Sequence, residues 1–160
     1  MNNTATPTAP GHWPFYHQAV VDIRLGNRTL RVTPCPSGTA TGSFPEPSGR
    51  TIHVITACNP GGSTAPAEDN DRAQGMLTDE LVRRHVSWWP ATGGDAAGVH
   101  VEQSAAVVGM SDTEAREVGR RFGQDAVFAW TLNSWRLLSC SSEATSVYGW
   151  RTTTQWRIGE

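Results

Sequence analysis

A short apolar run that ends in a turn is the feature that most constrains how this chain can fold. Residues 51–57, Thr-Ile-His-Val-Ile-Thr-Ala, are followed by Cys58 and then by the turn residues Asn59-Pro60-Gly61-Gly62. Runs of this length and composition, bounded by turn residues, are typical of buried β-strands. Such a strand brings the next loop to the rim of the fold, where backbone N–H groups and small polar side chains can contact a ligand. We therefore expect a site near residue 59, although the run does not identify its chemistry.

Further strand patterns lie on both sides of this run. Residues 18–25 alternate apolar and polar side chains, and Gly26-Asn27 separates them from a returning strand at 29–33, as in a β-hairpin. The segment 34–49 is rich in Pro, Gly, Ser and Thr and predicts a long loop that is either flexible or functional. Strand patterns recur at 86–90, before a loop at 93–95, and then at 99–110, 126–131 and 135–140.

Two segments have instead the three- and four-residue spacing of amphipathic helices. Residues 68–84 repeat apolar side chains at this spacing, with acidic residues at the start and basic residues at the end, which suits the helix dipole. Residues 112–122 follow a capping box formed by Ser111 and Glu114, and Gly123 stands where a C-terminal cap belongs. The second segment is therefore predicted to be a helix with well-defined ends.

The order of strands, helix, strands, helix and strands predicts an α+β fold. We expect a single domain with a mainly antiparallel or mixed sheet and two helices, at about 68–84 and 112–122, packed on one face. Residues 1–12 are polar and rich in Thr and Pro, and they predict a disordered tail. The domain is expected to span 13–140, and residues 141–160 are expected to be an extension that can add a strand.

Composition excludes several classes of function. A chain of 160 residues fits one domain with a real core. The net charge is −2 and 18% of residues are charged, so there is no electrostatic reason to expect nucleic acid or an anionic membrane as partner. All 13 basic residues are Arg, which excludes a catalytic lysine, a lysine Schiff base and the lysine of a P-loop.

The cysteines and histidines point to a reducing compartment and to no metal. Cys35, Cys58 and Cys140 are an odd number without CxxC spacing, so we expect a cytoplasmic protein without a disulfide framework. No segment approaches the length of a membrane span. The five histidines lack the HxH and HExxH spacings of metal ligands, and the sequence identifies no cofactor.

Five pieces of the chain, taken together and in order, are Thr56-Ala57-Cys58-Asn59-Pro60, Asn70, Glu102-Gln103-Ser104, Gly109, and Phe122-Gly123-Gln124-Asp125-Ala126. In this order they resemble the bacterial family known as domain of unknown function 3293. The resemblance covers roughly residues 13–139 and implies a compact cytoplasmic bacterial domain, but no reaction.

The chain departs from that family at three places. Cys58 stands where the family usually has an aromatic residue, and His100-Val101 stand where it usually has Trp. Gly61-Gly62 replace polar or basic residues that are common there. Ligand contacts made by those side chains in the family would not carry over to this chain.

The loop after residue 57 is the first candidate for chemistry. Thr56, Asn59, Ser63 and Asn70 would lie near the N-terminus of the first helix, where free N–H groups favour anions. Against a phosphate site, the loop lacks the P-loop ending and the helix opens with three acidic residues. Alternatively, these residues end the strand and cap the helix. We favour the structural role for Ser63 and a ligand role for Asn59 and Asn70.

Glu102 and Ser104 form the second candidate, because strand alternation places them on the same face. A carboxylate at the mouth of a strand can act as a general base or anchor a ligand once burial raises its pKa. Equally, Glu102 could lie at a sheet edge paired with Arg72 or Arg121. A triad of Ser104, His100 and Glu102 is excluded, because neighbours in one strand cannot form that relay.

Three other features have weaker links to function. Gln124 could present its amide to a ligand, although a polar turn is the favoured interpretation. Cys58 could be a thiol nucleophile, but a single cysteine at a strand end is more often a small buried side chain. Trp88-Trp89-Pro90 could form an aromatic wall, while core packing is expected for at least one of the two tryptophans.

Together these residues predict a pocket for a small polar or nucleotide-like ligand, formed by the 56–63 loop, Asn70 and Glu102. Glu102 is the catalytic candidate if the protein is an enzyme. The alternative is a protein-interaction module that uses a Trp-rich surface and the 34–49 loop. The first hypothesis requires the side chains to converge within about 12 Å, the span of an ordinary pocket. The predicted ligand-binding residues are Thr56, Asn59, Asn70, Ser104 and Gln124.

Overall fold

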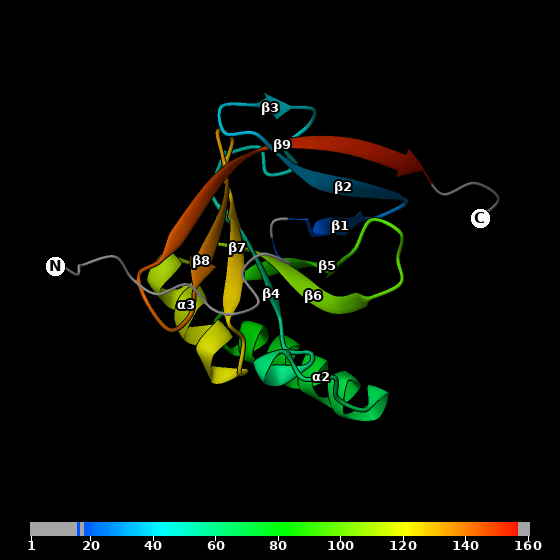
Figure 1. Cartoon of the computed structure of the whole chain (residues 1–160), viewed down its shortest axis with the longest axis vertical. Helices are drawn as coiled ribbons and strands as arrows, with labels where there is room; N and C mark the ends of the chain where they lie inside the picture. The colour runs from blue at the N-terminus through cyan, green and yellow to red at the C-terminus, as the bar shows by residue number, and fades with distance from the viewer. Residues whose placement is uncertain (1–15, 17, 157–160) are drawn as a thin grey trace, which may run out of the picture.

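The computed structural model describes residue 16 and residues 18–156, and its central feature is a closed antiparallel barrel (Figure 1). The sheet order is β2-β1-β5-β6-β4-β7-β8-β9-β3, and a further pairing of β2 with β9 closes eight strands into the barrel. The short β3 pairs with β9 in parallel. The strands are β1 (Val20–Leu25), β2 (Arg28–Cys35), β3 (Ala40–Thr41), β4 (Ile52–Thr56), β5 (Ser87–Gly94), β6 (Val101–Val108), β7 (Ala126–Trp130), β8 (Trp135–Ser139) and β9 (Thr145–Trp156).

Two helices cover one side of the barrel. They are α2 (Ala67–Arg83) and α3 (Asp112–Arg121), and a short 3₁₀ turn at Pro60–Gly62 precedes α2. Figure 1 shows both helices on the same side, below β4 and β7 in this view, with β3 at the opposite end of the molecule. Two helices and a mainly antiparallel sheet in one domain agree with the prediction. Closure of this sheet into a barrel is more specific than the prediction, which did not say how the sheet ends.

Strand β9 closes the barrel. Its first residues pair with β8, from Trp135 opposite Tyr148, and the rest pair with β2 as far as Arg28 opposite Trp156. The segment 141–160, expected as an extension, thus contributes a 12-residue strand. Because β2 and β9 lie more than a hundred residues apart, no local sequence pattern could have indicated their pairing.

Aromatic side chains fill one end of the barrel interior. Trp130, Trp135 and Trp150 are all at most 3% exposed and pack edge to face. Phe44, from the long loop predicted at 34–49, packs on Trp130 with ring centroids 4.7 Å apart. That loop therefore closes this end of the barrel by hydrophobic packing, which excludes water from the core.

A second core lies between the helices and the outer face of the sheet. Leu77 and Leu81 of α2 and Val118 of α3 are fully buried in one cluster with outward residues of β4, β6 and β7. Gly119 allows α3 to approach β8, because a Cβ atom there would lie 2.5 Å from Cys140 Sγ. The strands of this side are consequently buried on both faces, which explains their nearly continuous apolar runs.

Two boundaries differ from the expectations. Gly93 and Gly94, expected in a loop, lie within β5 and pair with Glu102 and Val101 of β6. A Cβ atom at Gly94 would overlap the backbone of His100, so glycine here permits a close strand approach. The expected cap of the first helix is also absent, since α2 follows Pro66 without a side-chain cap.

Some expectations concern residues outside the described range or the membrane. The disordered tail expected at 1–12 lies outside the described residues. Within the described part of the chain, neither helix has the length and apolar character needed to cross a membrane.

Candidate functional site: a cavity at the open end of the barrel

The end of the barrel opposite Phe44 contains a cavity of about 590 Å³. Its floor is formed by Val54 and Phe128. Two positions away on the same strands, Ile52 and Trp130 belong to the aromatic end. Thr56, Ser104 and Glu102 stand on its wall. The cavity thus occupies the stretch of the interior that the large side chains leave unfilled. A concave site with an apolar floor and a few polar groups is typical of small-molecule binding.

Strand alternation aims Glu102 into this cavity. On β6, Glu102, Ser104, Ala106 and Val108 project to the same face, and the last two belong to the barrel core. The predicted common face of Glu102 and Ser104 is therefore the interior of the barrel. A glutamate occurs there because β6 reaches past the filled core to the open end.

Asn59 holds the Glu102 carboxylate in position. Its Nδ2 donates to Glu102 Oε2 at 2.8 Å, and its Oδ1 accepts from Asn70 Nδ2 and from the backbone N–H of Ala65, both at 2.9 Å. The backbone N–H of Asn59 donates in turn to Asn70 Oδ1 at 2.9 Å. The side chains of Asn59, Asn70 and Glu102 therefore converge in one hydrogen-bonded chain, well within 12 Å of one another.

The backbone at Asn59 has an unusual conformation. Its φ and ψ angles are 50° and 58°, in the left-handed region. Among residues with a side chain, Asn is one of the few that adopt this region at low cost. The turn after β4 therefore depends on Asn59 both for its backbone geometry and for its three side-chain hydrogen bonds.

The other predicted site residues divide into cavity wall and loop support. Thr56 lines the cavity, but its hydroxyl donates to the Gln103 carbonyl at 2.7 Å and accepts from Cys58 N–H. Gln124 lies behind the loop and donates to the Cys58 carbonyl at 2.9 Å. Thr56, Asn59 and Ser104 therefore line the cavity, whereas Asn70 and Gln124 support the loop from behind.

Glu102 has no cationic partner among the described residues. Arg72 pairs with Asp69, and Arg121 pairs with Glu80, so neither arginine considered for Glu102 reaches it. Burial raises the pKa of Glu102, and the hydrogen bond from Asn59 offsets part of that rise. Oε1 of Glu102 accepts no hydrogen bond from the described residues, so this oxygen is free to meet a ligand.

Several cavity residues were not predicted from the sequence. Phe128 could have been found, because it alternates with Ala126 and Trp130 on one face of β7. Gly93 was assigned to a loop, and nothing in the local pattern marks Tyr16. The pKa of the Tyr16 phenol is raised, mainly by burial and then by the negative charges of nearby carboxylates that include Glu102.

The structure shows the surroundings of Cys58 and how the possible metal-ligating side chains are distributed among the described residues. Cys58 is 3% exposed and burial raises the pKa of its thiol, which makes it a small buried side chain and a poor nucleophile. No three His, Cys, Asp or Glu residues of the described chain are grouped so that they could hold a metal ion.

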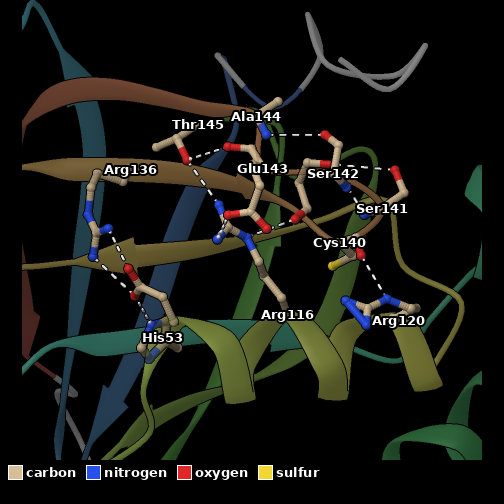
Figure 2. Close-up of polar contacts among 12 residues, drawn as sticks. His53, Arg116, Arg120, Arg136, Cys140, Ser141, Ser142, Glu143, Ala144 and Thr145 are labelled. Atoms are coloured by element: carbon tan, nitrogen blue, oxygen red, sulfur yellow. Dashed lines mark hydrogen bonds and ion pairs between the residues drawn. The ribbon is translucent and has the colours of Figure 1, made fainter. Parts of the chain in front are cut away.

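A second polar cluster lies between α3 and the outer face of the barrel (Figure 2). His53 is fully buried, and its Nε2 lies 2.8 Å from Asp112 Oδ1. Arg136 donates to both oxygens of Asp112, at 2.7 and 3.2 Å. Figure 2 also shows Arg116 and Arg120 of α3, which donate to carbonyl groups at the end of β8. This cluster joins α3, β4 and β8.

The charges of this second cluster are compensated. Hydrogen bonds from Arg136, and then from His53, lower the pKa of Asp112 to about 2 in spite of partial burial. Burial lowers the pKa of His53, so the imidazole is neutral and donates from Nε2 to the carboxylate. Neither His53 nor Asp112 lines the cavity, and we assign this cluster a structural role.

Comparison with known proteins bears on the same part of the chain. Residues 55–127 match the family described as protein of unknown function (DUF3293), a shorter stretch than the 13–139 over which the resemblance was expected. This stretch includes Asn59, Asn70, Glu102 and Gln124. No curated protein and no solved structure matches the chain. Over residues 55–127 the chain is therefore similar to the DUF3293 family of proteins of unknown function.

Proposed function

We propose that the protein binds a small polar molecule in the barrel cavity, with Glu102 as the polar anchor. The observation that carries this proposal is a carboxylate that faces a cavity of about 590 Å³, with one oxygen held by Asn59 and the other free of described donors. A partly buried carboxylate without a cation among the described residues costs free energy, so its presence needs a reason beyond packing. A ligand that donates to the free oxygen supplies that reason.

The surrounding residues suit a binding site that is formed before the ligand arrives. Asn70 and the backbone of Ala65 fix the amide of Asn59, and Asn59 fixes Glu102. Gln124 holds the same loop through the Cys58 carbonyl. Groups that are already oriented lose little conformational entropy on binding, which increases affinity.

Proton transfer by Glu102 is the catalytic part of the proposal. General acid–base groups work best when their pKa lies near the operating pH. Burial moves the pKa of Glu102 upward from the usual range, in that direction. If the ligand is transformed, we assign the proton transfer to Glu102, which lies on the cavity wall within reach of a bound molecule.

The alternative function, protein interaction, has less support. Trp130, Trp135 and Trp150 pack inside the barrel, and the 34–49 loop places Phe44 on two of them. These residues are therefore used in the core. Among the described tryptophans only Trp156 is mainly exposed, at 61%, and Arg28 lies over its ring. We favour ligand binding for this reason.

The protein's setting is proposed to be the bacterial cytoplasm. Cys35, Cys58 and Cys140 are free, which supports a compartment that keeps thiols reduced. Similarity to the family over residues 55–127 gives no reaction and no location.

Thermal shift measurements with a panel of metabolites test the proposed function. A ligand present at about 100 times its Kd stabilises the folded state by about 2.7 kcal/mol, which is readily measured. We expect at least one compound to raise the Tm of the wild type and of the control Glu117→Ala, an exposed position on α3, but not that of Glu102→Ala. Equal shifts in all three proteins would refute the assignment of the site to the cavity.

A further inference from the structure

The described wall of the cavity carries carboxylates and no arginine. Glu102 and Asp95 both line it, and the chain has no lysine at all. The stretch before Tyr16, which lies outside the described residues, also contains neither Arg nor Lys. The other ionisable side chains of the described lining are the exposed imidazole of His100 and the phenol of Tyr16. A phosphate or carboxylate ligand would therefore meet negative charge here without an arginine or lysine to compensate it. This argues against the phosphate groups of the nucleotide-like ligand that was predicted.

The carboxylate of Asp95 is already used within the protein, whereas that of Glu102 is not fully used. Asp95 Oδ1 accepts from the backbone N–H of Val99 at 2.7 Å, and both oxygens lie near the N–H of His100. Glu102 accepts one hydrogen bond from a neutral amide. Asp95 therefore adds negative potential at the rim, and Glu102 offers the acceptor.

The floor of the cavity is aromatic and firmly held. The Phe128 ring stacks on Trp135 with centroids 4.8 Å apart and an interplanar angle of 27°. Tyr16 meets Phe128 edge to face at 6.2 Å. Aromatic faces attract cations and also pack against flat apolar groups. A ligand with both a positive group and an apolar body would match this floor and the wall together.

We propose that the ligand of this cavity is a small organic cation of the amine or amidine class, whose N–H groups donate to Glu102 and whose apolar body lies over Val54 and Phe128. This inference rests on the proposed binding function and narrows it to one charge class. A cation next to Glu102 supplies the compensating charge that the described residues do not provide. Binding therefore favours the ionised form of Glu102 and releases a proton wherever that carboxyl was protonated in the free protein.

Three probes of nearly equal shape and different charge test the proposal. They are benzamidine (a cation), benzamide (neutral) and benzoate (an anion), titrated into the whole chain by calorimetry and by amide NMR. We expect benzamidine to bind at least tenfold more tightly than benzamide, which corresponds to about 1.4 kcal/mol, and benzoate not to bind. Amide shifts should concentrate at Asn59, Gly93 and Phe128, which line the cavity.

Variants at Glu102 connect this preference to one carboxylate. Glu102→Gln keeps the shape and can still accept from Asn59, so it should lose at least tenfold in benzamidine affinity and leave benzamide unchanged. Glu102→Asp keeps the charge and should retain a preference for the cation, as should the control Glu117→Gln. Benzamidine affinity of the wild type should rise with pH as Glu102 ionises, and this dependence should be absent in Glu102→Gln.

The outcomes separate the charge class from the site itself. If benzamide or benzoate binds as tightly as benzamidine and still shifts the cavity amides, the cation inference fails and the ligand site stands. If no probe of any charge perturbs the cavity amides, and the metabolite panel is also silent, both proposals fail. Benzamidine binding that survives unchanged in Glu102→Gln would overturn the assigned partner.

Discussion

Two partly buried carboxylates beside strand β4 have opposite environments. Asp112, next to His53 on the outer face of the barrel, accepts from Arg136 and His53, and its pKa is lowered to about 2. Glu102, next to Asn59 inside the barrel mouth, accepts from one neutral amide, and burial raises its pKa. One carboxylate is thus stabilised in its ionised form by its surroundings, and the other is not.

This difference is the one expected between a structural carboxylate and the carboxylate that we propose binds a ligand. Where a carboxylate only connects elements of the fold, a neighbouring cation offsets the free energy needed to remove that carboxylate from water. Where a carboxylate turns an unpaired oxygen toward a cavity, the desolvation free energy is not offset in the ligand-free protein. A bound ligand that donates to that oxygen can offset it. We therefore expect neutral replacements of the two carboxylates to change the free energy of unfolding in opposite directions.

The largest expected effect is at Asn59, which connects the loop to Glu102. Asn59→Ala removes three side-chain hydrogen bonds and places Ala in the left-handed region. At about 1 kcal/mol for each bond, we expect a loss of about 3 kcal/mol in the free energy of unfolding, measured by urea denaturation.

The matched control at this position is Asn59→Gly, which tolerates the left-handed backbone. It should be about 1 kcal/mol more stable than Asn59→Ala. Equal stability of the two variants would show that the backbone conformation at residue 59 carries no cost. A loss under 1 kcal/mol in Asn59→Ala would contradict the prediction that the loop depends on this side chain.

The next effect is at Arg136, the cation of the structural cluster. Arg136→Met leaves Asp112 with His53 alone, so the unfolding free energy should fall by about 2 kcal/mol. This is below the 3–5 kcal/mol typical of fully buried pairs, because the Asp112 side chain is 37% exposed. Urea denaturation measures this loss in unfolding free energy. The control is Arg72→Met, which removes the exposed ion pair with Asp69 on α2 and should change stability little. Similar losses in both variants would contradict the structural role of Arg136.

A smaller effect, with a clear pH signature, is expected at Asp112. Its folded pKa of about 2 lies below the usual value of 3.8, so its contribution is present above pH 3.8 and is lost as pH falls toward about 2. Asp112→Asn should therefore be less stable than the wild type by about 1 kcal/mol at pH 6, after allowance for exposure. The difference should shrink in acid, and a difference independent of pH would exclude the carboxylate charge as its cause.

The smallest effect, and the one opposite in sign, is expected at Glu102. Because the folded pKa is raised, the wild type loses stability as pH rises from the unfolded value through the folded one. Glu102→Gln, which avoids this loss, should be more stable than the wild type at pH 8 and approach it toward pH 4. Thermal unfolding across this pH range measures the difference, and a variant less stable at pH 8 would remove the contrast with Asp112.

Several local features of the two regions could be predicted from the sequence. The capping box at Ser111 predicted the start of α3, and both of its reciprocal hydrogen bonds are present in the structure. The turn after the apolar run and the alternation of Glu102 with Ser104 also indicated a polar site near residue 59. These features are local, because caps, turns and strand alternation depend on residues a few positions apart.

The partners of the charged groups could not be predicted in the same way. Arg72 and Arg121 were considered for Glu102, but they pair with Asp69 and Glu80. His53 was set aside with the other histidines, yet it meets Asp112 across 59 residues of chain. Long charged side chains pair with groups that lie close to them in space. Those distances depend on how the strands and helices pack, which local sequence patterns do not show.

The sequence by itself determined the helices, most of the strands and the common face of Glu102 and Ser104, since these follow from periodicity and turn chemistry over short stretches. Only the tertiary structure decided that this face is the inside of a barrel. Closure depends on β9 pairing with β2, from Arg28 opposite Trp156. That long-range pairing, with aromatic side chains filling one end, leaves the other end open and places an ordinary strand glutamate on the wall of a cavity.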